Sequence, residues 1–355
     1  MANTKKLIAA ILIPVMALAM TQMTAFAGEN TAEEPTYPAG SYKAMDTNGP
    51  EDPTSSTEPG SSTEPTTAPT SSTEPEPTTE PTTEPTTAPQ PIIPKAAVTK
   101  KGPGLFVSWG SIQGADYYEV YRSYSSGSRG SLIKKVTGST AYTDNAVASG
   151  KRAYYQVRAH KTDGTFTGYS GAVSDVIYRV YIETGHGSDA RGRWDPGCKW
   201  KKYQEAKLMI PICQSMTKYL RAKGVYVYTD AFNGNRTNLK WLMRNLKGYN
   251  VSFLVNVHCD YKRAPRGTLP LYRYADQKRL AQCLNTGVHK TVKIRNRGLK
   301  ARKNLACLNQ THSYCTSCLF ETGNIRKDNK ILRKQYDAYG KGLAMGVCSY
   351  LGVRW

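Results

Sequence analysis

The chain has 355 residues, which allows two ordered domains plus additional segments, because domains commonly contain about 100–200 residues. Residues 28–94 hold twelve acidic side chains and a single Lys, whereas residues 95–355 hold 45 Lys and Arg against 15 Asp and Glu. This basic excess favours a polyanionic partner, such as nucleic acid, an acidic lipid surface or an anionic cell wall. A solvated basic surface without such a partner gives the same composition.

The N-terminus has the pattern of a secretory signal peptide. Lys5 and Lys6 precede an apolar run over 7–20, and residues 25–27 supply the small residues of a cleavage site. A retained membrane anchor is the alternative, but the run is shorter than the roughly 20 residues that a spanning helix needs. We therefore predict that residues 1–27 are removed. The mature protein is then secreted, extracellular or associated with the cell wall, without stable membrane insertion.

Residues 28–94 are poor in apolar side chains and repeat Thr-Glu-Pro and Thr-Ala-Pro units, as at 63–65 and 87–89. Frequent Pro and mutually repelling Glu favour an extended, semi-stiff chain without a packed core. We predict a disordered Thr/Ser/Glu/Pro-rich linker over this region.

Residues 95–178 alternate apolar and polar side chains in short runs, at 105–109, 117–121 and 154–159, with Gly and Ser turns between them. This pattern is typical of antiparallel strands. The Trp near the end of an early strand and the Tyr-rich later strands resemble a fibronectin type III module, which is a β-sandwich of similar length. We predict such an all-β module over 95–178.

Residues 179–355 combine apolar strand-like runs at 179–182, 225–228 and 251–255 with a helical apolar spacing over 205–223 that Gly224 ends. Pro211 lies inside that helix and favours a kink. Strands that alternate with helices indicate an α/β domain. We predict a mixed, largely parallel sheet flanked by helices.

Two histidines, His186 and His258, follow predicted strands of this domain. Because ligands bind at strand ends in α/β sheets, both imidazoles are expected at one edge of the sheet, with Glu205 at the start of the next helix. Two His and one carboxylate with an open fourth position form a ligand set for catalytic zinc. Glu321, which ends another apolar run, is a candidate general base that takes a proton from water and passes it to a leaving amine.

Five motifs occur in order along this region: Gly-His-Gly at 185–187 followed by Asp-Pro-Gly at 195–197, then 255–258, 296–300 and 319–323. Together they resemble the zinc-dependent N-acetylmuramoyl-L-alanine amidases of bacterial cell walls and their phages. The resemblance implies a zinc-dependent amidase domain over 179–355 that cleaves the amide bond between N-acetylmuramic acid and L-alanine with zinc-activated water.

By the same resemblance, one zinc ion would be bound by His186, Glu205 and His258, and Glu321 would be the catalytic base and acid. Substrate-binding residues would be Arg297, Asn256 and Asp260. Peptidoglycan and anionic cell-wall polymers are the expected partners, nucleic acid is not, and the protein is expected to be monomeric. Four residues near the expected groove depart from the family pattern: Asp230, Asp260, Thr316 and Asn324.

The eight cysteines all follow residue 180, and an even number in an exported chain permits disulfides, although the pairing does not follow from the sequence. A structural metal site is an alternative for four of the Cys and His residues, at 307, 312, 315 and 318. Three other functions remain open. They are a catalytically inactive wall-binding or adhesive protein with an amidase-like domain, a dinucleotide site at 185–190, and a secreted nucleic-acid binder.

Overall fold

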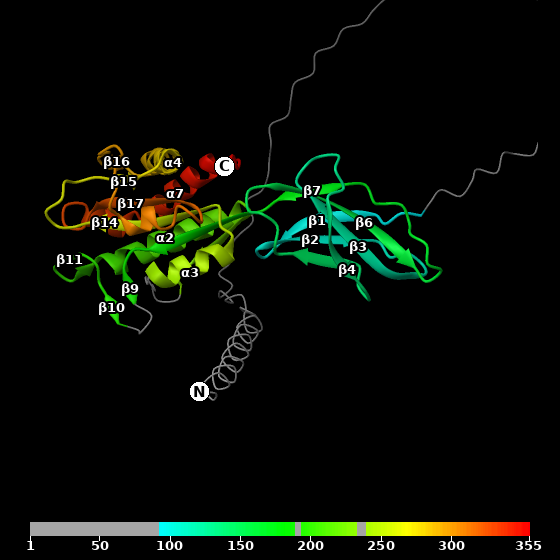
Figure 1. The fold of residues 1–355 in the computed structure, drawn as a ribbon. Helices are drawn as coiled ribbons and strands as arrows, with labels where there is room; N and C mark the ends of the chain where they lie inside the picture. Colours follow the sequence, from blue (N-terminus) through cyan, green and yellow to red (C-terminus); the bar gives the residue numbers. More distant parts are fainter. Residues whose placement is uncertain (1–91, 189–192, 233–238) are drawn as a thin grey trace, which may run out of the picture. The chain divides into compact units, whose positions relative to one another are not determined.

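The computed structural model describes residues 92–188, 193–232 and 239–355 (Figure 1). The predicted signal peptide, 1–27, and all but the last three residues of the predicted linker, 28–94, lie outside the described residues. Within the described ranges, no helix is long and apolar enough to cross a membrane.

The N-terminal part of the described chain consists of two antiparallel sheets. One has the order β1-β2-β5 and the other the order β4-β3-β6-β7. Their strands are β1 Ala96–Lys101, β2 Gly104–Trp109, β3 Ala115–Ser123, β4 Ser131–Val136, β5 Ala141–Asp144, β6 Arg152–Lys161 and β7 Val173–Val176. Leu105, Val120 and Val157 belong to one buried cluster that residues of both sheets share. The alternating runs of the sequence therefore form strands, as predicted.

The C-terminal part is a mixed α/β domain built on one six-stranded sheet of order β13-β8-β14-β17-β15-β16. Its strands are β8 Tyr178–Thr184, β13 Val225–Thr229, β14 Phe253–Asp260, β15 Leu269–Tyr272, β16 Lys300–Ala301 and β17 Thr316–Asn324. β15 pairs with β17 antiparallel, whereas every other neighbouring pair is parallel. The predicted mixed, largely parallel sheet is confirmed.

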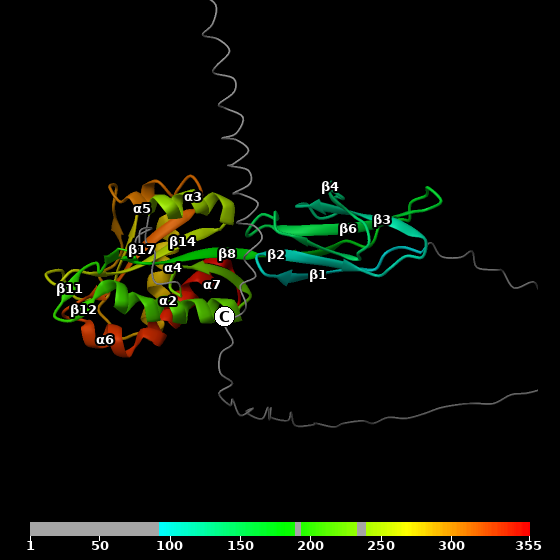
Figure 2. The same cartoon turned by 90° about the horizontal axis from the view of Figure 1, so that it is seen from below.

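Helices cover both faces of this sheet (Figures 1 and 2). They are α2 Glu205–Ala222, α3 Leu239–Tyr249, α4 Ala275–Thr291, α5 Ala306–Asn309, α6 Asn329–Lys334 and α7 Tyr336–Leu351. The larger apolar core combines one face of the sheet with α2, α4 and α7. The opposite face packs against α3 and α5 in two smaller clusters. Both faces of the central strands are therefore buried, which explains their nearly continuous apolar sequences.

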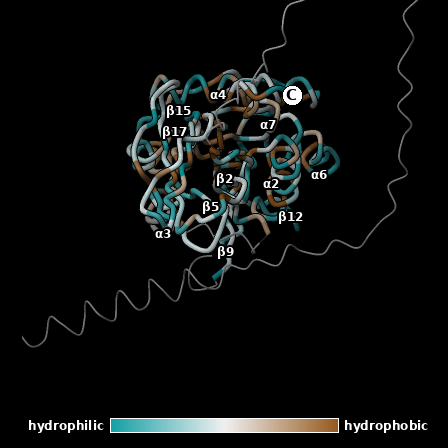
Figure 3. Tube along the Cα trace, turned by 90° about the vertical axis from the view of Figure 1, so that its right-hand side faces the viewer, coloured by the Kyte–Doolittle hydropathy of each residue, from teal (hydrophilic) through white to brown (hydrophobic). Residues whose placement is uncertain are grey.

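The helix α2 illustrates how the sequence dictates this packing. Leu208, Ile212, Met216 and Leu220 recur at helical spacing, and all four are buried in the larger core. Gly224, at φ 71°, follows the helix in the left-handed conformation that favours glycine. The helix is continuous through Pro211. Figure 3 shows the hydrophobic parts of the trace gathered towards the interior and the hydrophilic parts outside.

The connection from β8 to α2 contains two short antiparallel pairs, β9 Gly187–Ser188 with β10 Trp194–Asp195, and β11 Lys199–Trp200 with β12 Tyr203–Gln204. In the first pair, Asp195 lies opposite Gly187. The pairing therefore returns the chain to the neighbourhood of His186 before α2 begins.

Candidate metal centre

Three elements bring the predicted metal ligands together. His186 follows the end of β8 by two residues, Glu205 is the first residue of α2, and His258 lies near the end of β14. The sequence placed His258 after its strand, whereas the parallel pairing of β14 with β17 extends to Asp260. Because β8 and β14 are adjacent and parallel, both histidines are at the carboxyl edge of the sheet.

One ligand atom from each of these three side chains lies within 4.8 Å of the others. The Nδ1 atom of His258 is 2.9 Å from Oε1 of Glu205, and the Nε2 atom of His186 is 3.5 Å from Oε2 of the same carboxylate. The imidazole rings meet edge to face with centroids 5.1 Å apart. Two imidazoles and a carboxylate are ligands that zinc accepts, so the donor set fits the expected ion.

Two glycines leave the space that the histidine rings occupy. A Cβ atom on Gly185 would lie 2.6 Å from Nδ1 of His258. A Cβ atom on Gly197 would lie 2.5 Å from Cδ2 of His186 and 2.7 Å from Oε2 of Glu205, and its φ of +65° also disfavours other residues. The site therefore requires glycine at both positions.

The orientation of the His186 ring depends on Asp195, which the sequence presents only as part of the Asp-Pro-Gly motif. Asp195 Oδ2 lies 2.8 Å from Nδ1 of His186, while its Oδ1 accepts a hydrogen bond from the Gly197 N–H. A carboxylate on one ring nitrogen directs the other nitrogen towards a metal. Burial would raise the pKa of Asp195, but the hydrogen bonds with His186 and the Gly197 N–H, together with the charges of His186 and His258, lower it. His186 itself has a φ of 65°, which is unusual for a residue with a side chain.

Glu205 is the most fully satisfied group of the centre. Its side chain is 4% exposed, Oε1 accepts the Cys259 N–H at 3.0 Å, and Oε2 accepts the Cys198 N–H at 2.9 Å. Burial would raise the pKa of Glu205, but the hydrogen bond from His258 and the two nearby histidines lower it. The same contact raises the pKa of His258 to about 9, against the opposing effect of its burial. The centre therefore favours the ionised form of Glu205 with positive charge on the neighbouring His258.

The surroundings of Glu321 differ from those of the fully hydrogen-bonded Glu205. It lies on β17 directly beside His258 of β14 in the parallel register, so the two residues are neighbours at the sheet edge. Its Oε2 atom is enclosed and has no hydrogen-bond partner among the described residues. Burial raises the pKa of Glu321 to about 8, and Asp260 and Glu205 add to the effect while His258 and Arg297 oppose it. A carboxyl group with a raised pKa beside the metal ligands suits proton transfer.

A cavity of about 260 Å³ opens at the centre. Its lining comprises Glu183, His186, Asp195, His258, Ala306, Cys307 and Leu319. Glu183 precedes the Gly-His-Gly motif and was not predicted as a site residue from the sequence. Burial and the neighbouring Asp230 raise the pKa of Glu183 to about 8. Two of the three predicted metal ligands, His186 and His258, therefore line the cavity.

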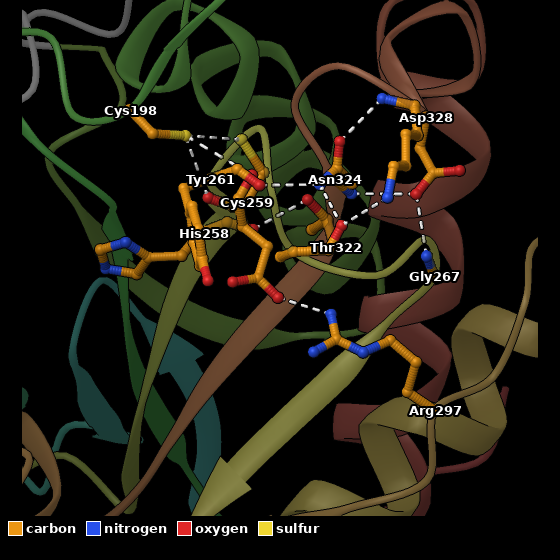
Figure 4. Close-up of polar contacts among 12 residues, drawn as sticks. Cys198, His258, Cys259, Tyr261, Gly267, Arg297, Thr322, Asn324 and Asp328 are labelled. Carbon is orange, nitrogen blue, oxygen red and sulfur yellow. Dashed lines mark hydrogen bonds and ion pairs between the residues drawn. The ribbon is translucent and has the colours of Figure 1, made fainter.

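The three predicted substrate-binding residues have different environments. Arg297 and Asp260 form an ion pair, and their side chains are 15% and 16% exposed (Figure 4). Asn256 is fully buried in β14, where its Nδ2 atom donates to the Cys318 carbonyl. It does not line the cavity described above. Substrate contacts of all three residues stay a prediction.

A hydrogen-bonded network behind the site fixes the strand that carries Glu321 (Figure 4). The Thr322 hydroxyl donates to the His258 carbonyl at 2.8 Å, joining β17 to β14. The Asn324 amide donates to the carbonyls of Tyr261 and Ala264. The Asp328 carboxylate in turn accepts the backbone N–H of Asn324 and of Gly267. Asn324 therefore holds the loop after β14.

All eight cysteines are free thiols in the structure. The predicted alternative of a structural metal site is not supported, because Cys315 and Cys318 pack into different apolar clusters on opposite faces of the sheet. Among the described residues, the only groups that satisfy the geometry of a metal site are the histidine set and a second set of Cys198, Glu205 and Cys259. The two sets share Glu205.

Residues 180–349 match the family model described as N-acetylmuramoyl-L-alanine amidase. The match lies within the α/β domain and covers just under half of the chain. No sequence among the curated proteins gives a significant match to the chain.

Solved structures of amidases resemble about half of this chain. The N-acetylmuramoyl-L-alanine amidase AmiC2 of Nostoc punctiforme is 23% identical, with a TM-score of 0.44, and the alignment covers 49% of this chain and 97% of that one. The catalytic domain of CwlV from Bacillus (Paenibacillus) polymyxa is 19% identical, with a TM-score of 0.45 and coverage of 50% and 100%. The CwlD amidase from Clostridioides difficile, in complex with the GerS lipoprotein, is 21% identical, with a TM-score of 0.43 and the same coverage.

Proposed function

We propose that this protein is a secreted peptidoglycan hydrolase that cleaves the amide bond between N-acetylmuramic acid and L-alanine with zinc as its cofactor. One observation carries the proposal: two imidazoles and a carboxylate converge within 4.8 Å at an open cavity, and on the adjacent strand Glu321 Oε2 has no hydrogen-bond partner among the described residues. The family match over residues 180–349 supports the substrate class.

His186, Glu205 and His258 would hold the ion. Zinc bound by three protein ligands supplies a Lewis acid that polarises a carbonyl oxygen and lowers the pKa of a water molecule. Asp195 keeps the His186 ring turned with Nε2 towards the site, because it occupies Nδ1. The two glycines beside the rings keep the ligand positions free of competing side chains.

Glu321 would perform the proton transfers. Its carboxylate takes a proton from the attacking water and donates that proton to the nitrogen of L-alanine when the amide bond breaks. Its enclosed position makes the carboxylate more basic than an exposed one, and a bound cation would add an opposing effect that keeps it ionised. Arg297, held by Asp260, presents guanidinium N–H groups that suit the carboxylates of a stem peptide.

We also propose a role for the regions before the catalytic domain. Residues 1–27 would direct export, and residues 28–94 would act as a spacer. The two-sheet module resembles fibronectin type III and would extend contact with the wall. The basic excess of residues 95–355 would retain the protein on anionic wall polymers, because opposite charges attract over about 8 Å at physiological ionic strength.

Digestion of purified peptidoglycan tests this function. The protein should release free amino groups, and no reducing sugar ends, and a zinc chelator should abolish the release until about one equivalent of zinc is restored. Mass spectrometry of the products should show muramic acid residues without peptide. Release of reducing ends would identify a glycosidase instead. Binding to walls without any release would identify the inactive wall-binding protein.

A further inference from the structure

Two cysteines face each other beside the metal ligands. The Sγ atoms of Cys198 and Cys259 lie 4.0 Å apart (Figure 4). Cys198 Sγ also lies 3.4 Å from the Cys259 carbonyl oxygen and 3.6 Å from that of Asp260. Cys198 belongs to the loop before α2, which begins at Glu205, and Cys259 belongs to β14, which carries His258. The two cysteines therefore lie on segments next to two predicted metal ligands.

The carboxylate of Glu205 determines this approach. Its Oε2 accepts the Cys198 N–H, and its Oε1 accepts the Cys259 N–H, at 2.9 and 3.0 Å. The Glu205 N–H in turn donates to the Cys198 carbonyl at 3.0 Å. Both cysteine backbones are therefore fixed by one buried group, which leaves their side chains directed at each other.

We propose that Cys198 and Cys259 form a disulfide in the exported protein, and that this bond stabilises the metal ligand set. The Sγ atoms need to approach by about 2 Å to reach the bond length of a disulfide. Cys259 is 3% exposed, whereas Cys198 is half-buried, so an oxidant reaches the pair through Cys198. An extracellular location provides the oxidising conditions in which such bonds persist.

The reaction is a thiol–disulfide exchange with an external disulfide, either of a small thiol or of an oxidoreductase. The Cys198 thiolate attacks that disulfide and forms a mixed disulfide, releasing one thiol. The Cys259 sulfur then attacks Cys198 Sγ and releases the second thiol. Two protons and two electrons move from the cysteine pair to the external disulfide, which becomes two thiols.

The bond would close a loop of about 60 residues that contains α2, β13 and α3, and cross-links across long loops stabilise a fold the most. Cys259 is adjacent to His258 in sequence, and Cys198 hydrogen-bonds Glu205. The cross-link would therefore hold two ligands at their spacing before the ion arrives. We expect slower zinc loss from the oxidised protein than from the reduced one.

Mass spectrometry of the full chain tests the bond directly. The purified protein, free of zinc and then loaded with zinc, is equilibrated in a buffer of reduced and oxidised glutathione, alkylated and digested without reductant. We expect a peptide that links Cys198 to Cys259. The link should be absent from Cys198→Ser and present in Cys283→Ser, which removes a half-buried cysteine outside the site. Alkylation of both Cys198 and Cys259 in most wild-type chains would overturn the proposal.

Stability and zinc release provide readouts that do not depend on activity. Reduction should lower the melting temperature of the wild type by about 5–10 °C and speed zinc transfer to a chelator about tenfold. The same reduction should change neither quantity in Cys198→Ser. If Cys198→Ser does not fold, comparison of oxidised and reduced wild type still decides the outcome.

A second equivalent of zinc in the wild type, lost in Cys198→Ser, would show that the pair binds metal with Glu205 and would overturn the disulfide. The inference rests on the export that we propose for the chain, and not on its amidase activity. The link is measured in glutathione buffer whether or not the protein cuts peptidoglycan. Failure of either proposal can therefore be recognised separately.

Discussion

Two glutamates at the same edge of the sheet have opposite surroundings. Glu205 has hydrogen bonds from two backbone N–H groups and from His258, and its pKa is lowered. Glu321 has an enclosed oxygen without a partner among the described residues, and burial raises its pKa. A carboxylate that is fully engaged is suited to hold a cation in place. A carboxyl without a partner among the described residues is free to exchange a proton, so the two environments support the two roles that we propose.

The largest effect is expected for Glu321→Gln. The amide keeps the size of the side chain but does not accept a proton, so turnover should fall by about 10²–10⁴ or more while zinc stays bound. Peptidoglycan turnover and zinc content of the same sample measure both quantities. Glu183→Gln is the matched control, because Glu183 is a second buried carboxyl in the same cavity. If Glu183→Gln is inactive and Glu321→Gln is active, the base is Glu183.

Glu205→Gln should act on the metal first. The substitution removes a negative charge and turns one acceptor into a donor that faces a backbone N–H, so the zinc content of the purified protein should fall below one equivalent. Elemental analysis after dialysis measures it. Glu119→Gln, which breaks a buried ion pair with Arg158 in the sandwich, should lower stability while leaving zinc content unchanged. Full zinc occupancy in Glu205→Gln would remove Glu205 from the ligand set.

Asp195→Asn tests the support of His186. An asparagine still hydrogen-bonds the ring but no longer offers a charge, so zinc affinity should fall by about 10–100-fold. Competition with a chromophoric chelator gives the affinity. Asp163→Asn, an exposed carboxylate in a turn of the sandwich, should leave the affinity as it is. Equal affinities for the two variants would mean that the contact between Asp195 and His186 does not matter for metal binding.

The smallest effect is expected at Arg297. In Arg297→Lys, the lysine keeps the positive charge of the arginine but lacks its planar guanidinium fork. KM for peptidoglycan fragments should therefore rise by about 3–10-fold with kcat little changed. Asp260→Asn should give a similar but smaller rise, because it frees the guanidinium without removing it. A fall in kcat alone would instead indicate that Arg297 acts on the transition state.

The sequence predicted the parts of this site that regular structure positions. Leu208, Ile212 and Met216 have the spacing of one helix face, and the helix that they define begins at Glu205 as expected. The apolar run 251–255 identified β14, and the parallel neighbours of that strand bring its end to the carboxyl edge. Periodicity therefore predicted which elements carry Glu205 and His258, because it determines which elements exist and where they end.

The sequence did not predict the contacts that depend on loop geometry. Asp195 reaches His186 through a short pairing of strands and a left-handed backbone at His186, and neither leaves a periodic signal. The close approach of Cys198 to Cys259 depends on the hydrogen bonds that Glu205 accepts from their two backbone N–H groups. Glu321 Oε2 has no hydrogen-bond partner among the described residues because of the side chains that pack around it in the folded chain. Such features arise from tertiary packing and not from local propensity.

The direct pairing of His258 with Glu321 has a consequence for how this site tolerates change. Adjacent strands of a sheet lie about 4.8 Å apart whatever their side chains are, so backbone hydrogen bonds set the distance between His258 and Glu321. The loop before β17 can lengthen, shorten or exchange residues without altering that spacing. Under the proposed function, selection for a different stem peptide can therefore act on that loop while His258 and Glu321 keep their positions.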